Sequence, residues 1–245
     1  MRTVIIDQAR MTSTRLPGKE LKEVLGRPLL AYQVERLRRV KLADEVVIAT
    51  TTNAADDVLA EFCRQRGLAV FRGSEHDVLA RYYFAAVEHR ADLIVRVTSD
   101  CPVIDPAVID RVIGHFLADA RALDYVSNTQ RRTFPRGMDA EVFTLAALGR
   151  AHAEGTLDYE REHVTPYLYR HPEVFRTDQV VHAVDLSRHR WTVDTIEDFE
   201  LVRRIIEALH PRNPRFDLDD IVGLFDSNPE LIKINAQVVQ KELGQ

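Results

Sequence analysis

The sequence predicts an α/β fold with a mostly parallel central sheet. Short apolar runs alternate with amphipathic segments through the first hundred residues, the order expected of βαβ units. The apolar runs are nearly continuous, as in strands that helices cover on both faces. The chain has 245 residues, 45% of them hydrophobic, and no internal repeat or linker. We therefore expect one domain over residues 1–245.

The first half of the chain supplies the regular part of this pattern. Leu30, Val34 and Leu37 recur at helical spacing and predict the first helix. Asn53 is the expected N-cap of the second helix, and Gly67 is its expected end. The strands expected here are 3–7, 45–50, 68–71 and 92–97, and the helices are 29–42, 54–66 and 78–90. Right-handed crossovers would make these four strands parallel.

The second half is less regular. Pro106 at an early helical position predicts a helix over 106–117, and a strand follows at 124–128. An alternating stretch, 138–143, predicts another strand, which we expect to lie over the sheet as part of an inserted loop. The remaining expected elements are helices at 145–154, 159–170, 199–209, 216–225 and 230–242, and strands at 176–186 and 190–193.

Composition argues against several classes of protein. The net charge of −5 and the pI near 6.0 leave no basic footprint for nucleic acid. Cys63 and Cys101 lie far apart and belong to no Cys/His array, so we expect neither a disulfide framework nor a zinc site. Met1 leads directly into an apolar strand, and no run is long enough to span a bilayer. We expect a soluble, cytoplasmic protein that does not engage membranes.

The most informative stretch is residues 7–19, which connects the first strand to the first helix. Arg10, Arg15 and Lys19 are spaced through a loop of small and hydroxylated residues. Arginine recognises phosphate oxygens in a bidentate manner, and lysine adds a mobile charge. Loops at the carboxyl ends of strands are where open α/β sheets bind phosphorylated ligands. The stretch predicts a clamp for a nucleoside triphosphate; the alternative is an exposed basic turn.

Two aspartates follow strands at the same predicted edge. Asp100 comes just after the fourth strand, and Asp194 comes between a short strand and a helix. Mg²⁺ binds one or two protein carboxylates together with substrate phosphates. Each aspartate alone is more simply a turn residue or a helix N-cap. Beside the cationic loop, the pair predicts a Mg²⁺ site.

Three other groups carry weaker signals. The first, which is a candidate lining for a base pocket, consists of Arg72, Ser74 and Arg81. The second, which suits a polar second substrate or charge pairs across an oligomer interface, consists of Arg136, Asp139 and Glu141. His163 with Glu160 or Glu162 is a possible acid/base pair, although a solvated helix face is the favoured reading. The sequence contains no GxGxxG, GxSxG, HExxH or Walker motif.

The opening block, ARMTSTRLPGK at 9–19, resembles the nucleotide-binding loop of the cytidylyltransferases that activate sugar acids as CMP-sugars. That family includes the 3-deoxy-manno-octulosonate and acylneuraminate cytidylyltransferases. The sequence is more similar to the spore-coat-polysaccharide-biosynthesis branch. The stretches that carry this similarity are RVTSDCPVID (96–105), FPRGMDAEVF (134–143), EREHVTPY (160–167) and WTVDTIED (191–198).

The resemblance implies a Rossmann-like nucleotide-diphospho-sugar transferase fold of the GT-A type, in a homodimer. An inserted region, 129–175, would bind the acceptor and contribute to dimerisation. The catalytic residues would be Arg10, Arg15 and Lys19. The nucleotide-binding residues would be Ala9, Arg10, Met11, Ser13, Arg15, Lys19, Arg72, Ser74, Arg81 and Asp100, and the metal ligands Asp100 and Asp194. Ser99 departs from the family pattern, which has glycine before this aspartate.

The expected reaction is transfer of CMP from CTP to a sugar acid or related acceptor, with Mg²⁺ as cofactor and release of pyrophosphate, for surface polysaccharide biosynthesis. Two alternatives stay open: a glycosyltransferase that uses a nucleotide-sugar, and a non-catalytic nucleotide-binding protein of the same fold. The acceptor is undetermined, because Arg136, Asp139 and Glu141 suit a carboxylated sugar, an amino sugar and another alcohol about equally.

Overall fold

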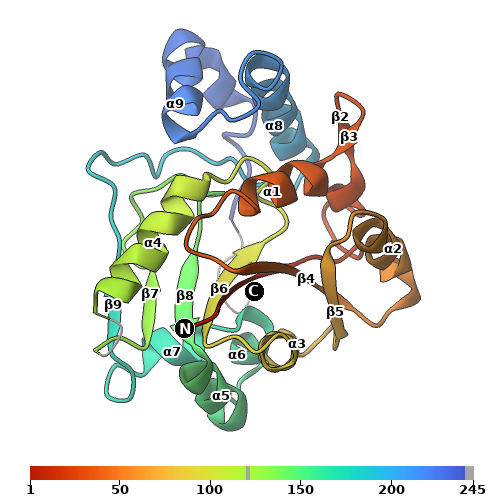
Figure 1. Cartoon of the computed structure of the whole chain (residues 1–245). Helices are drawn as coiled ribbons and strands as arrows, with labels where there is room; N and C mark the ends of the chain where they lie inside the picture. Colours follow the sequence, from red (N-terminus) through yellow and green to blue (C-terminus); the bar gives the residue numbers. More distant parts are fainter. Residues whose placement is uncertain (120–121, 241–245) are drawn as a thin grey trace.

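The computed structural model describes residues 1–119 and 122–240, which form a seven-stranded central sheet (Figure 1). In sheet order the strands are β5 (Ala69–Gly73), β4 (Glu45–Thr51), β1 (Thr3–Gln8), β6 (Leu93–Thr98), β8 (Glu141–Thr144), β7 (Tyr125–Ser127) and β9 (Thr177–Gln179). The first four are parallel, β8 runs antiparallel to both neighbours, and β9 is parallel to β7. The predicted α/β class with a mostly parallel sheet is confirmed.

Helices cover both faces of the sheet (Figure 1). One face packs against α1 (Leu29–Leu37), α2 (Asp57–Gln65) and α4 (Pro106–Ala118), and α8 (Ile196–Leu209) and α9 (Leu218–Ser227) extend the same hydrophobic core beyond α1. The other packs against α3 (Val78–Glu88), α5 (Leu145–Glu154), α6 (Asp158–His163) and α7 (Pro166–Arg170). On β1, Ile5 enters the first core while Val4 and Ile6 enter the second. Both faces of the strand are buried, which explains its continuous apolar run.

The prediction that the stretch 138–143 lies over the sheet was wrong. Its C-terminal part is β8, which is inserted into the sheet between β6 and β7. Val142 fills one core and Phe143 the other. Glu141 made the stretch look half-exposed, but it stands opposite Arg96 of β6 and forms an ion pair with it. The pairing neutralises a charge that the sequence alone assigns to solvent.

Several predicted boundaries also differ. The helix expected over 159–170 is split into α6 and α7 at Val164, whose φ is +71°, because Pro166 has no N–H to continue the first helix. The strands expected at 176–186 and 190–193 reduce to β9 and a single bridge between Arg136 and Arg190. Instead of the last predicted helix, 230–242, the chain has a 3₁₀ turn, η3 (Pro229–Lys233); residues 241–242 lie outside the described part.

The region before the second helix holds three further differences. The first helix ends at Leu37, and Asn53 precedes a 3₁₀ turn, η2 (Ala54–Asp56), without capping it; its amide donates to Glu75 instead. A small hairpin of β2 (Glu23–Val24) and β3 (Arg27–Pro28), preceded by η1 (Lys19–Leu21), was not predicted. Among the described residues, no helix has both the length and the apolarity to cross a membrane.

Candidate active site

The loop after β1 curls back on itself at the carboxyl edge of the sheet. The Ala9 N–H donates to the Ala49 carbonyl on β4 (3.1 Å), and the Gly18 N–H donates to the Met11 carbonyl (3.0 Å). Gly18 has a φ of +69°, a left-handed conformation that glycine adopts without strain. The turn at Gly18 sets the direction in which Lys19 leaves the loop.

Asp56, at the end of η2, anchors this loop to the sheet. Its Oδ1 accepts a hydrogen bond from the Met11 N–H (2.7 Å), and its Oδ2 accepts from the N–H (3.3 Å) and the hydroxyl of Thr51. Asp56 is fully buried, and Thr51 is the last residue of β4. A buried carboxylate that accepts from three donors fixes the position of the loop relative to the strand.

Lys19 brings the two predicted metal-binding carboxylates together. Its Nζ donates to Oδ1 of Asp194 (2.8 Å) and to the Val193 carbonyl (2.7 Å), and it lies 3.5 Å from Oδ2 of Asp100. Burial alone would lower the pKa of Lys19, but the two carboxylates outweigh it and raise the pKa, so the ammonium stays charged. The predicted loop cation and the two aspartates therefore form one cluster.

Asp194 is the centre of this cluster. Its Oδ2 forms an ion pair with Arg15 (3.0 Å) and accepts a hydrogen bond from Arg190 (2.9 Å), while its Oδ1 accepts from Lys19. Three cations thus converge on one carboxylate, and two of them come from the predicted triphosphate clamp. Arg15 is the most exposed of the three, so it is the most free to turn toward a ligand.

Asp100 is held beside Asp194 by backbone contacts. The Val193 N–H and the Thr192 hydroxyl donate to the Asp100 carbonyl at 2.8 and 3.2 Å. Burial alone would raise the pKa of Asp100, but the Lys19 ammonium and the Thr98 hydroxyl (2.5 Å) outweigh it and lower the pKa to about 2. The carboxylate is therefore ionised at neutral pH.

The donor set fits a hard divalent cation. Asp100 follows β6, Asp194 precedes α8, and both converge on a single positive charge, the Lys19 ammonium. Two carboxylates suffice for Mg²⁺, which completes its shell with water and phosphate oxygens. Among the described residues no group of three or more candidate ligands occurs. Ser99, the departure noted in the sequence, is buried and does not line the cavity described below.

The three predicted base-pocket residues lie together around the end of β5 and the start of α3. Arg72 donates from Nε to the Thr51 carbonyl (2.8 Å) and from Nη2 to the Asn53 carbonyl (2.9 Å), so it supports the end of β4. Arg81 is buried and donates to the Ser74 carbonyl (2.8 Å). Their side chains brace the backbone at this edge of the sheet.

Glu75 connects that region to the nucleotide loop. It accepts from the Thr12 hydroxyl (2.7 Å) and from the Asn53 amide, and it lies 3.8 Å from Nη1 of Arg10. Arg10 is among the more exposed cations of the loop. Of the other predicted loop residues, Ala9 is buried, Met11 packs against the α1–α2 core, and Ser13 is half-buried.

A cavity of about 770 Å³ opens beside the carboxylate cluster. Its walls include Arg15, Asp100 and Asp194 on one side and all three predicted acceptor residues on the other: Arg136, Asp139 and Glu141. No hydrogen bond or ion pair joins the Arg136 guanidinium to the residues that the structure describes, whereas Asp139 forms a bidentate pair with Arg132 at 2.6 and 2.9 Å. Arg136 is thus an unpaired cation in the cavity wall.

Glu141 plays a different part in the wall. Its Oε1 accepts from the hydroxyls of Tyr125 and Thr165, both at 2.7 Å, and its Oε2 pairs with Arg96. Both oxygens are already engaged, so Glu141 orients Arg96, which also lines the cavity. Arg96 is fully committed to its charged form, because Glu141 raises its pKa against the opposing effect of burial.

His163 lines the same cavity, but neither predicted partner forms an acid/base pair with it. Glu160 accepts hydrogen bonds from the N–H groups of Thr156 (3.0 Å) and Leu157 (3.1 Å). Burial lowers the pKa of His163, which favours the neutral imidazole. The predicted solvated face holds for Glu162, which is exposed, but not for Glu160, which is buried; His163 is half-buried in the cavity wall.

Sequence reasoning missed four residues that shape the site: Asp56, Glu75, Arg96 and Arg190. Asp56 and Glu75 are loop carboxylates without a motif around them. Arg96 carried a signal, because a charge inside a strand that is otherwise apolar needs a partner. Arg190 stands four residues before Asp194, and only the fold shows that both charges point to one place.

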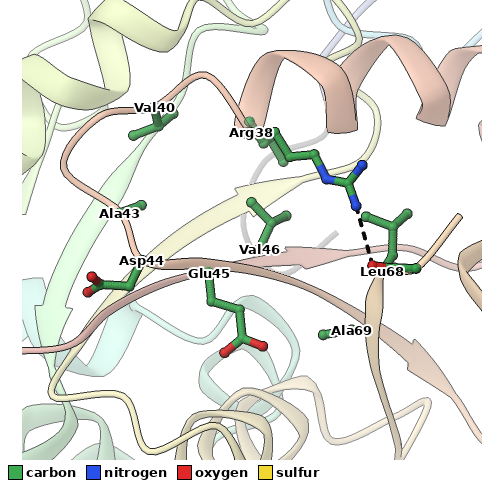
Figure 2. A pocket seen from close by; sticks show the side chains of 10 residues that line it. Arg38, Val40, Ala43, Asp44, Glu45, Val46, Leu68 and Ala69 are labelled. Atoms are coloured by element: carbon green, nitrogen blue, oxygen red, sulfur yellow. Dashed lines mark hydrogen bonds between the residues drawn. The ribbon is translucent and has the colours of Figure 1, made fainter.

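A second hollow, of about 340 Å³, lies at the opposite edge of the sheet, where β4 and β5 begin (Figure 2). Apolar side chains and the carboxylates of Asp44 and Glu45 line it, and the Arg38 guanidinium donates to the carbonyls of Arg66 and Gly67, both at 3.3 Å. None of the predicted site residues lines this hollow. The carboxylate cluster and its cavity are therefore the candidate active site.

Similar sequences point to one family. The family model described as cytidylyltransferase matches residues 3–224. An uncharacterized protein of Methanocaldococcus jannaschii is 37% identical over 243 residues, covering 98% of this chain and 97% of the relative. The spore coat polysaccharide biosynthesis protein SpsF of Bacillus subtilis is 33% identical over 235 residues, covering 93% and 95%.

Solved structures give the same result. A cytidylyltransferase from Leptospira borgpetersenii superimposes with a TM-score of 0.91 at 37% identity, covering 98% of this chain and 100% of the other. A CMP:2-keto-3-deoxy-manno-octonic acid synthetase in complex with CTP has a TM-score of 0.64 at 20% identity, covering 85% and 99%. The second likeness concerns the fold alone.

Proposed function

Since this chain belongs to the cytidylyltransferase family, we propose that it transfers CMP from CTP to a hydroxyl of a sugar acid or related acceptor, in polysaccharide biosynthesis. The name of the Bacillus subtilis relative supports the pathway class, and the CTP complex of a protein with the same fold supports the nucleotide. Pyrophosphate would be the second product.

The observation that carries the proposal is the cluster of Arg15, Lys19, Asp100 and Asp194 beside a cavity of about 770 Å³. Two cations and two carboxylates meet beside the carboxyl ends of β1 and β6, which are neighbours in the sheet. A triphosphate needs cations for its oxygens and a site for its counter-ion, and this cluster offers both.

In the proposed reaction the acceptor hydroxyl oxygen attacks the α-phosphorus of CTP in line. A new phosphorus–oxygen bond forms, the bond to the β-phosphate bridge breaks, and the hydroxyl proton passes to solvent. Arg15 and Lys19 would exchange their contacts with Asp194 for the β- and γ-phosphates, where charge accumulates as pyrophosphate leaves. Arg10, nearer the base side, would contact the α-phosphate or the nucleoside.

Asp100 and Asp194 would hold Mg²⁺. When bound, such an ion neutralises phosphate charge and orients the reacting oxygens. The protein's own contribution is to place both carboxylates side by side. The Lys19 ammonium and the Thr98 hydroxyl keep Asp100 ionised, and ion pairs with Arg15, Lys19 and Arg190 hold Asp194 in place.

The acceptor would lie between the carboxylate cluster and Arg136, Asp139 and Glu141. The unpaired guanidinium of Arg136 suits an acceptor carboxylate, and its half-buried position strengthens the attraction. Asp139 and Glu141 would act mainly by orienting Arg132 and Arg96, with which they already pair.

A thermal-shift panel tests the nucleotide. CTP, UTP, GTP, ATP and CMP-sugars are compared at equal concentration, with and without Mg²⁺. A ligand at about one hundred times its Kd stabilises a protein by about 2.7 kcal/mol, which a melting curve resolves. We expect stabilisation by CTP that depends on Mg²⁺. A preference for a nucleotide-sugar would instead indicate a glycosyltransferase, and no response would indicate a protein without nucleotide binding.

A further inference from the structure

Asp198, the third residue of α8, is fully buried and collects an unusual number of donors. It accepts from Nε and Nη2 of Arg190, both at 2.9 Å, and from the N–H groups of Asp194 (3.1 Å) and Thr195 (3.2 Å). The Asn235 amide donates to it at 2.8 Å. Asp198 thus ties the start of α8 to a residue near the C-terminus.

Arg190 is the link between Asp198 and the candidate active site. Its Nη2 bridges Asp198 and Oδ2 of Asp194, each at 2.9 Å. Its Nη1 donates to Oε1 of Gln240 at 2.5 Å, and its carbonyl accepts from the Asn235 amide at 3.0 Å. Unlike Arg15, Arg190 is nearly buried and bonded on several sides, so it cannot turn toward a ligand without breaking those bonds.

The residues that hold Arg190 come from the last part of the chain. After α9 and η3 the chain returns toward the sheet (Figure 1). Asn235 is nearly buried, and Gln240 reaches the wall of the 770 Å³ cavity that also contains Asp194. Both residues lie beyond position 224, where the match to the family model ends.

We propose that the C-terminal segment 235–240 is part of the active site and acts as a latch on Arg190, so that Asp194 keeps its position when Arg15 and Lys19 move to the triphosphate. Asn235 and Gln240 are positioning residues in this scheme, because they act through Arg190. That this positioning matters for nucleotide binding rests on the proposed function. That the segment holds Asp194 in place through Arg190 follows from the contacts alone.

Hydrogen exchange on the ligand-free protein tests the structural content. Asn235→Ala removes one donor from Asp198 and one from the Arg190 carbonyl. We expect the amides of Asp194 and Thr195, which donate to Asp198, to exchange about fivefold faster, as loss of about one hydrogen bond implies. Unchanged exchange in the peptide 190–198 would overturn the inference, whatever the protein binds.

Calorimetric titration of CTP, with and without Mg²⁺, tests the catalytic content. Gln240→Ala should weaken binding of Mg·CTP about threefold to tenfold, and Asn235→Ala roughly tenfold, since each removes hydrogen bonds that fix a charged group. Val239→Ala is the matched control, because Val239 is 81% exposed and adjacent.

The two proposals fail in different ways. A parent chain that binds no nucleotide in calorimetry would overturn the proposed function, while faster exchange in Asn235→Ala would still support the latch. A parent chain that binds Mg·CTP, with Gln240→Ala and Asn235→Ala binding equally well, would overturn the latch and leave the proposed function in place.

Discussion

At the scale of single residues, the candidate site depends on how charges are paired before any ligand arrives. Asp194 neutralises Arg15 and Lys19 in the ligand-free protein, and these contacts keep the clamp cations from being buried without a partner. A triphosphate would take over the same cations. The site is therefore electrostatically complete in both states, which reduces the cost of binding a highly charged ligand.

Replacing Asp194 with asparagine tests the proposed metal ligand. The amide keeps the size of the side chain but loses the charge, so we expect turnover to fall by about three orders of magnitude while the fold persists. Pyrophosphate release with saturating CTP, Mg²⁺ and a sugar-acid acceptor measures the effect, and circular dichroism checks the fold. Asp185→Asn, in an exposed loop, is the control. Pyrophosphate release at the parent rate would remove Asp194 from the metal site.

Glu20 gives the site a pH-dependent stability. Burial raises its pKa from 4.5 to about 7, and its Oε2 has no hydrogen-bond partner among the described residues. The raised pKa means that the folded state favours the protonated form. The full stability contributed by that proton is present below pH 4.5, and it is lost as the pH rises through about 7.

Glu20→Gln should remove this dependence. At pH 8 the variant should be more stable than the parent by about 3 kcal/mol, and the difference should vanish near pH 4.5. Urea unfolding at pH 4.5, 6 and 8 measures it. A difference that is the same at all three values would show that ionisation of Glu20 is not its cause.

At the scale of elements, the site is assembled by short segments that brace one another. The nucleotide loop is braced by η2 through Asp56, and the segment 190–194 is braced by the turn at Gly137. These joints place side chains from distant parts of the chain within a few ångströms. Substitutions at the joints should therefore affect both stability and binding.

Asp56→Ala should loosen the nucleotide loop. It deprives Met11 and Thr51 of a buried acceptor, so we expect a loss of about 2–3 kcal/mol in stability and a KM for CTP raised about tenfold. Asp56→Asn retains one acceptor oxygen, so it should lose less stability and raise the KM for CTP less than Asp56→Ala does. Asp57→Ala, next to it in an exposed ion pair, should change stability by less than about 1 kcal/mol. Equal effects of Asp56→Ala and Asp57→Ala would contradict the anchor role.

Gly137→Ala should push the backbone at residue 137 away from the backbone of Trp191 and Thr192. Gly137 has a φ of +103°, and a Cβ there would lie 2.7 Å from the carbonyl carbon of Trp191 and 2.9 Å from the nitrogen of Thr192. We expect a loss of about 3 kcal/mol or more and a matching loss of activity. Gly223→Ala, where a Cβ meets nothing within 4 Å in the helix α9, should be neutral or stabilising. Thermal unfolding that ranks the two variants otherwise would refute the close-contact argument.

At the scale of the whole molecule, the candidate site lies at the carboxyl edge of the sheet. Away from it, two large apolar side chains of α3 stay exposed. On α3, Phe84 and Val87 are about half exposed, and the Phe84 ring meets His152 of α5 edge-on at 5.4 Å. Large exposed apolar groups that adjoin are typical of an interface. The helix α5 lies within 129–175, the region for which the family resemblance implies dimerisation. We propose that α3 and α5 form the dimer contact.

Light scattering after gel filtration tests the dimer. We expect twice the chain mass of 28.0 kDa for the parent and the chain mass for Phe84→Glu, because a buried carboxylate without a partner disfavours association. Val184→Glu, at an exposed position elsewhere, should leave the mass unchanged. If the parent chain is a monomer, the dimer proposal is wrong. If Phe84→Glu is still a dimer, the interface does not include Phe84.

Much of the fold was predictable because it depends on local patterns. Continuous apolar runs located β1, β4 and β6, and helical spacing located α3, α4 and α5 with small errors. The boundaries failed where local and distant interactions compete. Asn53 has the chemistry of a cap, but Glu75 from another loop attracts its amide.

The sequence by itself determined the alternation of strands and helices in the first hundred residues, the cationic loop, and the two candidate aspartates, since these depend on residue type and spacing. The tertiary structure decided which charges meet. It placed β8 inside the sheet so that Glu141 pairs with Arg96, and it brought Asn235 back to Arg190. Such pairings follow from chain crossings many residues apart, and spacing along the chain carries no information about them.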